Sequence, residues 1–237
     1  MMKKTILLLS FACALIACSK IDNYDAPNAT LRGEVIDSYT GQPLLSEQPQ
    51  GFYIRYKELS DKYPDAIYRS FWGKADGSFN NTKLFATTYE VFPYDGAFYQ
   101  PEAQKVTLES NGTVEVKFSV TPYLAVTESK VEFDRSAKVL HASFVLRRPE
   151  QSAAKPAKAF VALTWNPNVS YYCHGDSGIS GNLVMRSVSE TDLGGRISFD
   201  VDCSKLSTGH TWYVRLGCIS NKNNNRANYS EVFSFKY

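Results

Sequence analysis

Residues 33–44, GEVIDSYTGQPL, decide the fold of this chain. The pair Thr40-Gly41 predicts a turn between two strands, because glycine adopts a positive φ without steric cost. The pair Asp76-Gly77 predicts a second turn of the same kind. Apolar side chains follow these turns and are predicted to fill the space between two sheets: Phe79, Leu84, Tyr89 and Val91. The stretch therefore predicts two β-strands joined by a tight turn at the start of the first domain.

Apolar and polar residues alternate along many further stretches, which is the pattern of a strand with one buried face. The clearest case is residues 113–120, TVEVKFSV. Asn111-Gly112 lies between this strand and residues 104–109, and it predicts a β-hairpin. The alternation recurs in residues 140–146, 161–165, 197–201, 212–216 and 233–237. With no long amphipathic helix, the pattern predicts an all-β chain of two consecutive β-sandwich domains.

The N-terminus carries a bacterial export signal. Two lysines precede an apolar run, residues 6–16, which is shorter than the ~20 residues of a membrane-spanning helix. The run ends in LIAC, the spacing of a lipobox, so residues 1–17 are predicted to be removed and Cys18 to carry lipid. The alternative is an ordinary secreted protein with a chance cysteine at the cut. Because Ser19 follows the cysteine, we expect a lipid-anchored protein of the outer membrane, displayed on the cell surface.

The rest of the chain divides into a tether and two domains. Residues 18–28 are polar and suit a flexible tether. We place the first domain at residues 29–121 and the second at residues 122–237. The signal holds two of the 26 basic residues and no acidic one, so the mature chain has 24 of each. This balance argues against nucleic-acid binding, which needs a basic face.

Three cysteines remain after the signal and the lipid site: Cys173, Cys203 and Cys218. An exported protein can form disulfides, and a Cys203–Cys218 bridge between neighbouring strands is one interpretation. Three buried thiols, behaving as small apolar side chains, are the alternative that we favour.

The first domain resembles the carboxypeptidase-regulatory-like, transthyretin-like sandwiches. Residues 33–44 fit the pattern G-x-V-x-D followed by T-G-x-P-L, and residues 76–79 fit D-G-x-F. Residues 84–91 resemble the G-x-Y-x-V stretch that follows in that family, with Thr88 in place of the glycine. The resemblance implies a non-catalytic scaffold.

The second domain resembles fibronectin type III and immunoglobulin-like sandwiches. Residues 206–216, LSTGHTWYVRL, are similar to the corner between strands E and F of the fibronectin domains. Trp212 holds the place of the usual corner tyrosine if Leu206 sets the register, and Tyr213 takes that place if a bulge intervenes.

The whole layout resembles an uncharacterised Bacteroidetes family of two-domain outer-membrane lipoproteins. Members of that kind accompany glycan importers of the SusC/SusD type. The resemblance implies a surface accessory protein for glycan capture, with a polysaccharide or oligosaccharide and such a transporter as partners.

Three patterns point weakly to catalysis or metal binding. Residues 173–178, CHGDSG, are similar to the serine protease nucleophile motif, but His141, the upstream histidine, lies in a strand pattern. Cys173 and His174 lack a second ligand pair at zinc spacing. Acidic residues in predicted loops could pair for glycoside hydrolysis: Glu47, Glu58, Asp61 and Asp65. We interpret all three as ordinary loops and expect no catalytic residue, metal or cofactor.

Exposed aromatic side chains beside polar ones are the composition of a carbohydrate site, because sugar C–H faces stack on flat rings. Three stretches have this composition, residues 68–74, 94–100 and 165–172. Our candidate ligand-binding residues are Tyr94, Tyr99, Tyr171 and Tyr172, which lie in predicted loops, followed by Trp72. The sequence thus favours a non-catalytic glycan-binding surface lipoprotein. A structural or protein-interaction module, such as an adhesin or fimbrial-type subunit, is the alternative, and a glycoside hydrolase is a weaker one.

Overall fold

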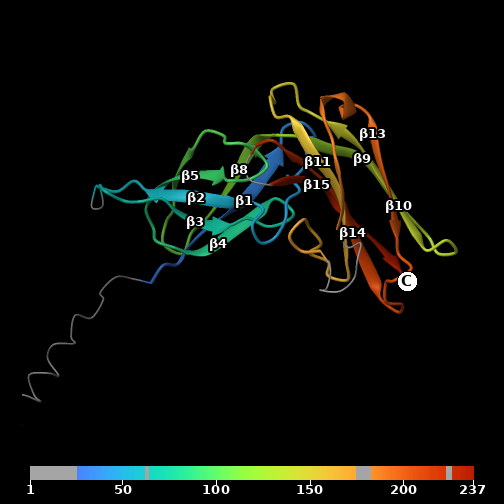
Figure 1. Ribbon diagram of the computed structural model, residues 1–237. Helices are drawn as coiled ribbons and strands as arrows, with labels where there is room; N and C mark the ends of the chain where they lie inside the picture. The colour runs from blue at the N-terminus through green and yellow to red at the C-terminus, as the bar shows by residue number, and fades with distance from the viewer. Residues whose placement is uncertain (1–25, 62–63, 175–182, 223–225) are drawn as a thin grey trace, which may run out of the picture.

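The computed structural model describes residues 26–61, 64–174, 183–222 and 226–237, and its regular structure is almost entirely β-strand (Figure 1). The signal at residues 1–17, the lipid site Cys18 and most of the tether lie outside the described residues. Within the described part of the chain, no helix is long and apolar enough to cross a membrane.

Two four-stranded sheets form the first sandwich, with strand orders β4-β1-β8-β6 and β3-β2-β5-β7. The strands of the first sheet are β1 (Ala29–Asp37), β4 (Ser78–Leu84), β6 (Phe98–Tyr99) and β8 (Thr113–Pro122). Those of the second sheet are β2 (Tyr53–Glu58), β3 (Arg69–Trp72), β5 (Thr88–Tyr94) and β7 (Gln104–Thr107). The core between them contains the four apolar residues predicted from the turns, Phe79, Leu84, Tyr89 and Val91, each at most 4% exposed.

The opening stretch forms β1 and the turn after it, as predicted. Gly41 and Gly77 have φ of 70° and 81°, the positive values for which glycine is suited. Gly33 serves another purpose, because β1 runs parallel to β8 and a Cβ at this position would lie 1.8 Å from the Val116 carbonyl oxygen. The glycine therefore permits the close approach of the two central strands.

The predicted hairpin at Asn111-Gly112 is wrong. The turn exists, with Asn111 at φ 58° and the Gly112 amide bonded to the Glu109 carbonyl at 2.9 Å. The strands on either side join different sheets, however, since β7 pairs with β5 while β8 pairs with β1 and β6. Both flanking strands bury their apolar faces in the same core, β7 from one sheet and β8 from the other.

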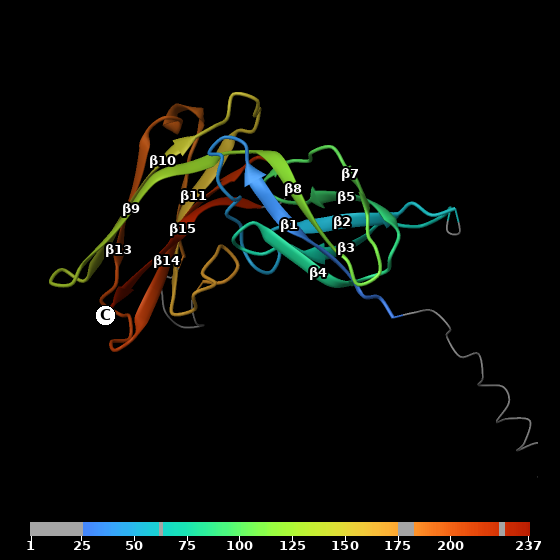
Figure 2. The same cartoon turned by 180° about the vertical axis from the view of Figure 1, so that it is seen from behind.

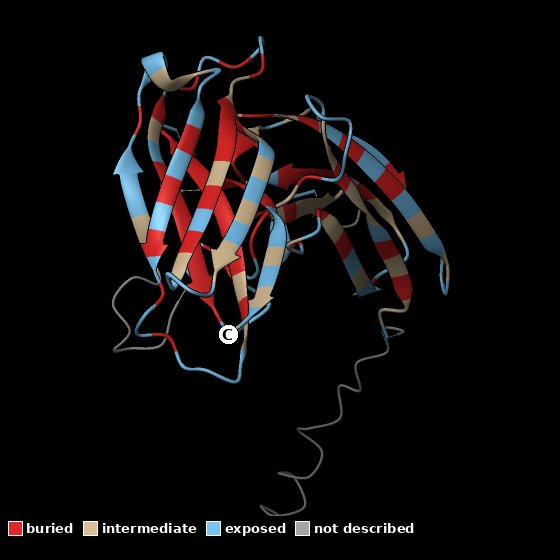
Figure 3. Cartoon of the chain, turned by 90° about the vertical axis from the view of Figure 1, so that its right-hand side faces the viewer, coloured by how far each residue is buried: buried red, intermediate tan, exposed pale blue. Residues whose placement is uncertain are grey.

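The second sandwich packs a three-stranded sheet, β13-β10-β9, against a four-stranded one, β12-β11-β14-β15. Buried and exposed positions alternate along β13, whereas β11 and β14 are buried over most of their length (Figure 3). The strands are β9 (Ala125–Asp134), β10 (Val139–Arg147), β11 (Pro156–Thr164), β12 (Leu183–Ser187), β13 (Arg196–Asp202), β14 (Thr211–Ser220) and β15 (Ala227–Lys236), with a short 3-10 helix at Glu190–Asp192. The chain is therefore all-β, with two consecutive sandwiches, as the alternation predicted.

Trp212 occupies the predicted corner of the second sandwich. Its side chain is 1% exposed, and its indole Nε1 donates a hydrogen bond to the Ser207 carbonyl at 3.1 Å. This bond ties β14 to the chain entering it, as a corner tyrosine does in fibronectin domains. Of the two registers left open by the sequence, the contacts favour Trp212 over Tyr213.

All three remaining cysteines are free thiols, so the Cys203–Cys218 bridge is not formed. Cys203 and Cys218 are fully buried, and burial raises the pKa of the Cys203 thiol to about 11. Cys173 is half-buried. The two buried thiols pack as small apolar side chains in the core of the second sandwich.

The described strands pair only within their own sandwich, and the chain passes from one to the other between β8 and β9. Asn228 on β15 bridges this junction: its side-chain oxygen accepts from the Leu124 amide at 3.1 Å, and its nitrogen donates to the Ala97 carbonyl at 3.0 Å. Arg226 forms an ion pair with Asp95 at 2.6 Å. These partly desolvated contacts hold the sandwiches together.

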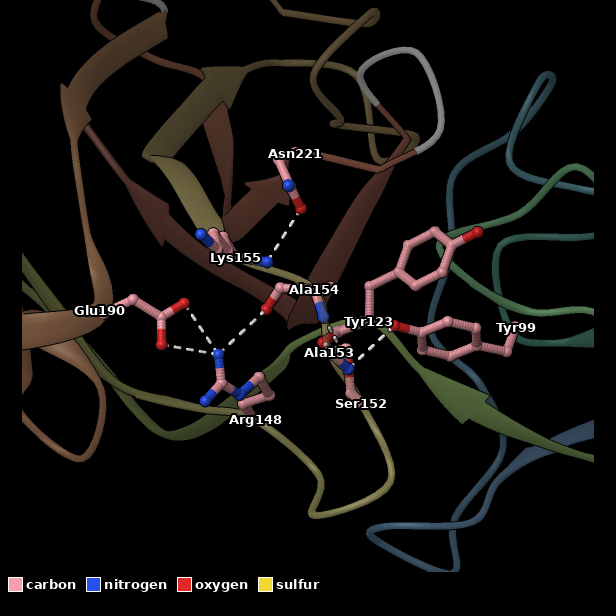
Figure 4. A network of polar contacts seen from close by, with 9 residues as sticks. All are labelled: Tyr99, Tyr123, Arg148, Ser152, Ala153, Ala154, Lys155, Glu190 and Asn221. Carbon is pink, nitrogen blue, oxygen red and sulfur yellow. Dashed lines mark hydrogen bonds and ion pairs between the residues drawn. The ribbon is translucent and has the colours of Figure 1, made fainter.

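A second set of contacts crosses the junction through the loop between β10 and β11 (Figure 4). The Ser152 hydroxyl donates to the Tyr123 carbonyl at 2.7 Å, and the Ala153 amide donates to the Tyr99 hydroxyl at 3.0 Å. On the other side of the same loop, Arg148 binds both carboxylate oxygens of Glu190. The loop is thereby fixed against the first sandwich.

Candidate functional site

The outer face of the β3-β2-β5 sheet carries a group of aromatic side chains that we call the aromatic platform: Tyr53, Tyr68, Trp72, Phe92 and Tyr94. Successive side chains of a strand point to opposite faces of the sheet. On β2, Ile54 is fully buried in the core, and on β5, Val91 is as well. The residues that alternate with them therefore point away from the core.

Three aromatic rings of the platform share one rung of the sheet. Tyr53 pairs with Trp72 on β3 and with Tyr94 on β5. The Tyr53 and Trp72 rings stack with centroids 3.8 Å apart and an interplanar angle of 24°. Trp72 and Tyr94 remain 39% and 37% exposed. Strands lie ~4.8 Å apart, so these three side chains form a strip across three strands, with Tyr53 and Trp72 stacked face to face.

Two cations lie on the rings of the platform. The Arg55 guanidinium lies 4.2 Å from the Tyr94 ring centroid and 5.4 Å from that of Tyr68. The Lys57 ammonium lies 5.2 Å from the Tyr68 centroid. All three distances are within the range of cation–π attraction, which holds the rings and the cations in place.

Tyr68 extends the platform along the strands. Its hydroxyl donates a short hydrogen bond to the Glu90 carboxylate, and this bond raises the pKa of the tyrosine. Its ring packs edge-on against Phe92, with centroids 5.5 Å apart. Tyr68 is thus protonated and held in place, with its one O–H donated to Glu90, and its side chain is still 39% exposed.

The rung of Tyr53, Trp72 and Tyr94 lies at the end of the sheet next to the second sandwich. Asp95, directly after Tyr94, is the residue that pairs with Arg226. The Arg226 side chain also donates to the Gln50 carbonyl in the loop that leads into β2. The platform therefore borders the junction between the two sandwiches.

Glu47, in the first sandwich, is buried at this junction and is only 1% exposed. Neither carboxylate oxygen has a hydrogen-bond partner among the described residues. Burial raises the pKa of Glu47, while the nearby Tyr229 and Ser170 hydroxyls and the charge of Arg226 oppose the rise. Glu47 is therefore a buried acid of the domain junction, and the expectation of a solvated loop carboxylate was wrong for this residue.

The five predicted ligand-binding residues do not form one cluster. Trp72 and Tyr94 come together in the platform. Tyr99, half-buried, packs edge-on against Tyr123 with centroids 4.9 Å apart and accepts the Ala153 amide at the junction. Tyr94 and Tyr99 each end a strand, so neither lies in the predicted loop.

Tyr171 and Tyr172 lie on a loop of the second sandwich, after β11. The Tyr171 ring packs against buried Phe160, with centroids 5.5 Å apart, while Tyr172 is 51% exposed. The loop contacts the first sandwich where Glu47 is buried against Ser170 and Tyr229. Tyr172 is the member of this pair that is available to a ligand.

Sequence reasoning missed Tyr53, Arg55 and Lys57. These residues occupy every second position of β2, between residues that point into the core. Large aromatic and cationic side chains at the outward positions of a strand were the available signal of a binding face. The grouping itself was not visible, because residues 53, 72 and 94 become neighbours only through strand pairing.

Of the predicted acidic residues, the structure brings Glu58 and Asp65 to one cavity of about 960 Å³ at the end of the β2-β5 sheet opposite the junction. Arg69, Lys83 and Phe85 also line it.

The other two predicted acidic residues lie elsewhere. Asp61 is exposed and does not line this cavity, and Glu47 is buried at the opposite end of the sheet.

The protease-like stretch, residues 173–178, lies mostly outside the described residues. His141 is on β10, where its Nδ1 contacts the Asp200 carboxylate at 2.6 Å. Within the described ranges, no group of three or more histidine, cysteine, aspartate or glutamate side chains is arranged to hold a metal ion.

Comparison with known proteins gives fold neighbours but no family. No family model matches the chain, and neither does any curated protein. A protein of Bacteroides uniformis named "putative carbohydrate binding protein" has a TM-score of 0.75 at 22% identity, over 89% of this chain and 100% of its own. A DUF3823 family protein of the same species scores 0.73 at 22% identity, over 89% and 99% of the two chains.

A DUF3823 family protein of Parabacteroides merdae has a TM-score of 0.71 at 22% identity, over 90% of this chain and 100% of its own. These neighbours share the all-β fold of this chain. At such identities the likeness concerns the fold alone, and the arrangement of both sandwiches is common to all three.

Proposed function

We propose that this chain is a non-catalytic glycan-binding protein whose binding face is the aromatic platform. One observation carries the proposal: Trp72 and Tyr94, exposed by more than a third, lie on one rung of an open sheet face. Flat rings at the surface stack on the C–H faces of sugars, and nearby polar groups bind the hydroxyls. The name of the fold neighbour from Bacteroides uniformis supports the same class of ligand.

Pre-organisation of the rings supports the proposal. Tyr53 stacks on Trp72, and Arg55 lies on Tyr94, so neither exposed ring has to be ordered when a ligand arrives. A binding face that is rigid before binding loses less conformational entropy when the ligand binds. The affinity is therefore higher, which matters for ligands that bind weakly, such as glycans. The Tyr68 hydroxyl, fixed by Glu90, adds a polar group at the edge of the strip.

The test is affinity electrophoresis in gels that contain a panel of polysaccharides. The wild type should be retarded by at least one polymer, and Trp72→Ala and Tyr94→Ala should each lose about tenfold or more in affinity, corresponding to about 1.4 kcal/mol. Trp165→Ala is the matched control, because Trp165 is also 44% exposed but lies on the second sandwich.

Equal loss in the Trp165→Ala variant, or full retardation of both platform variants, would contradict the proposal. If no polymer retards the wild type and the protein co-purifies with an outer-membrane transporter, the protein-interaction role replaces glycan binding.

We further propose that Cys18 carries lipid and anchors the protein to the outer membrane, at the cell surface, beside a SusC/SusD-type transporter. The described chain begins at the end of the first sandwich that lies away from the second (Figures 1 and 2). An anchor before this point leaves the domain junction, and the platform rung next to it, accessible from the outside. Tethering near a transporter raises the local concentration of ligand.

Labelling cells with radioactive palmitate tests the anchor. The wild type should incorporate the label, and Cys18→Ser should not. Incorporation that is equal in the two proteins would exclude Cys18 as the attachment site.

A further inference from the structure

The cations of the aromatic platform outnumber its acids. The outward-facing residues of the sheet include Arg55 and Lys57 on β2 and Lys105 on β7, which lies opposite Glu90. Glu90 is the one carboxylate in these rungs, and the Tyr68 hydroxyl already binds it. The face that carries the exposed rings is therefore positively charged, although the mature chain as a whole is balanced.

Arg55 differs from most arginines of the chain in its partners. Six arginines form ion pairs with carboxylates: Arg32, Arg147, Arg148, Arg186, Arg196 and Arg226. Arg135 and Arg215 donate to carbonyl oxygens. Among the described residues, Arg55 has neither an ion pair nor a hydrogen-bond acceptor, and its contacts are the faces of Tyr94 and Tyr68.

An arginine that lies on a ring keeps its N–H edge available for a planar anion. Guanidinium groups bind carboxylates and sulfated groups through two parallel hydrogen bonds, and stacking on aromatic rings pre-organises them for this. Lys57 lies one rung further along β2, also over Tyr68. A sugar unit stacked on Trp72 or Tyr94 would thus place its substituents next to Arg55, which has no ion pair in the described chain. Lys57 adds a second cation one rung further along, although it lies opposite Glu90.

We propose that the aromatic platform binds acidic glycans, with the carboxylate or sulfate group of the sugar against Arg55 and Lys57. The inference rests on the proposed function, because it assigns a ligand class to the same face. Stacking on the rings holds the sugar, and the cations select polymers that carry negative charge.

The test compares pairs of polymers that share a backbone and differ in charge. Polygalacturonate is compared with its fully methyl-esterified form, and dextran sulfate with dextran, by affinity electrophoresis at about 50 mM NaCl. At least one charged polymer should bind about tenfold tighter than its uncharged counterpart. The preference should weaken at about 300 mM NaCl, because salt screens exposed charges. Preference for polygalacturonate identifies a carboxylate ligand, and preference for dextran sulfate identifies a sulfate ligand.

Two variants separate selection at the platform from general charge attraction. Arg55→Gln should reduce the ratio of charged to uncharged binding to about threefold or less, by loss of one charge-assisted pair. Lys130→Gln removes one positive charge from an exposed position of the second sandwich and should leave the ratio unchanged. Trp72→Ala should weaken binding to every polymer.

The outcomes distinguish the two proposals. Equal binding of charged and uncharged polymers, or an equal effect of Arg55→Gln and Lys130→Gln, overturns the acidic ligand and leaves glycan binding standing. An unchanged ratio in Arg55→Gln overturns the assignment of the anion to this residue. Failure of every polymer to bind overturns glycan binding itself, and the acidic ligand with it.

Discussion

At the scale of single residues, Glu47 is an acid whose surroundings disfavour its charged form. It is buried at the junction, and the free energy of ionising it there is raised by the loss of water. Its pKa in the folded chain lies above its ordinary value of 4.5, so the folded state takes up a proton more readily than the unfolded state. Its contribution to stability is therefore lost as the pH rises through the raised pKa and is recovered as the pH falls toward 4.5.

We expect Glu47→Gln to increase the free energy of unfolding by about 1 to 3 kcal/mol at about pH 7.5, because the neutral amide avoids the desolvation cost of the buried charge. The difference from the wild type should shrink as the pH falls toward the ordinary glutamate value. Urea denaturation at several pH values measures it, with the exposed Glu102→Gln as control. A destabilised Glu47→Gln protein at neutral pH would show that the ionised carboxylate is favourable at the junction.

At the scale of strands, the pairing of β1 with β8 depends on Gly33. A Cβ there would lie 1.8 Å from the Val116 carbonyl oxygen and 2.6 Å from the Phe79 ring, and backbone cannot move aside as a flexible side chain does. Gly33→Ala should lower the free energy of unfolding by about 3 kcal/mol, the upper end of overpacking costs.

The measurement is the midpoint of chemical denaturation. The control is Gly195→Ala, where the nearest atom to a Cβ would be the Asp192 carbonyl oxygen at 3.2 Å in an exposed turn. Similar midpoints for the two variants would mean that the close approach of β1 and β8 is not required.

The sequence predicted the strands better than their partners. Alternation along residues 113–120 correctly assigned the buried face, since Val116, Phe118 and Val120 are all buried. The same local reasoning failed at Asn111-Gly112, because a turn signal specifies the turn and leaves open whether the flanking strands pair or cross between sheets. Local sequence reports propensity, whereas pairing depends on which strands from distant parts of the chain are available as partners.

The candidate site has the same limit. Trp72 and Tyr94 were predicted from composition, but Tyr53 and Arg55 were not, because their role depends on neighbours in two other strands. Tyr99 resembled them in the sequence, and its hydroxyl instead accepts a bond from Ala153 at the junction.

At the scale of the whole molecule, buried bonds across the junction should couple the two sandwiches. Asn228→Ala removes the acceptor of the Leu124 amide, which is buried, and this should cost about 1 to 3 kcal/mol. We expect one calorimetric unfolding transition in the wild type and a lower or divided transition in the variant. Asn80→Ala, an exposed change on β4, is the control. Two separate transitions in the wild type, with neither moved by Asn228→Ala, would exclude the coupling.

The central claim is that glycans bind at the exposed rings of the β3-β2-β5 sheet, and NMR of the three tryptophan indoles tests it most directly. The account predicts that a bound oligosaccharide shifts the indole N–H signal of Trp72. The signals of Trp165, exposed on the second sandwich, and of buried Trp212 should stay in place. Binding that leaves the Trp72 signal unmoved, or that shifts the Trp165 signal instead, would contradict the account.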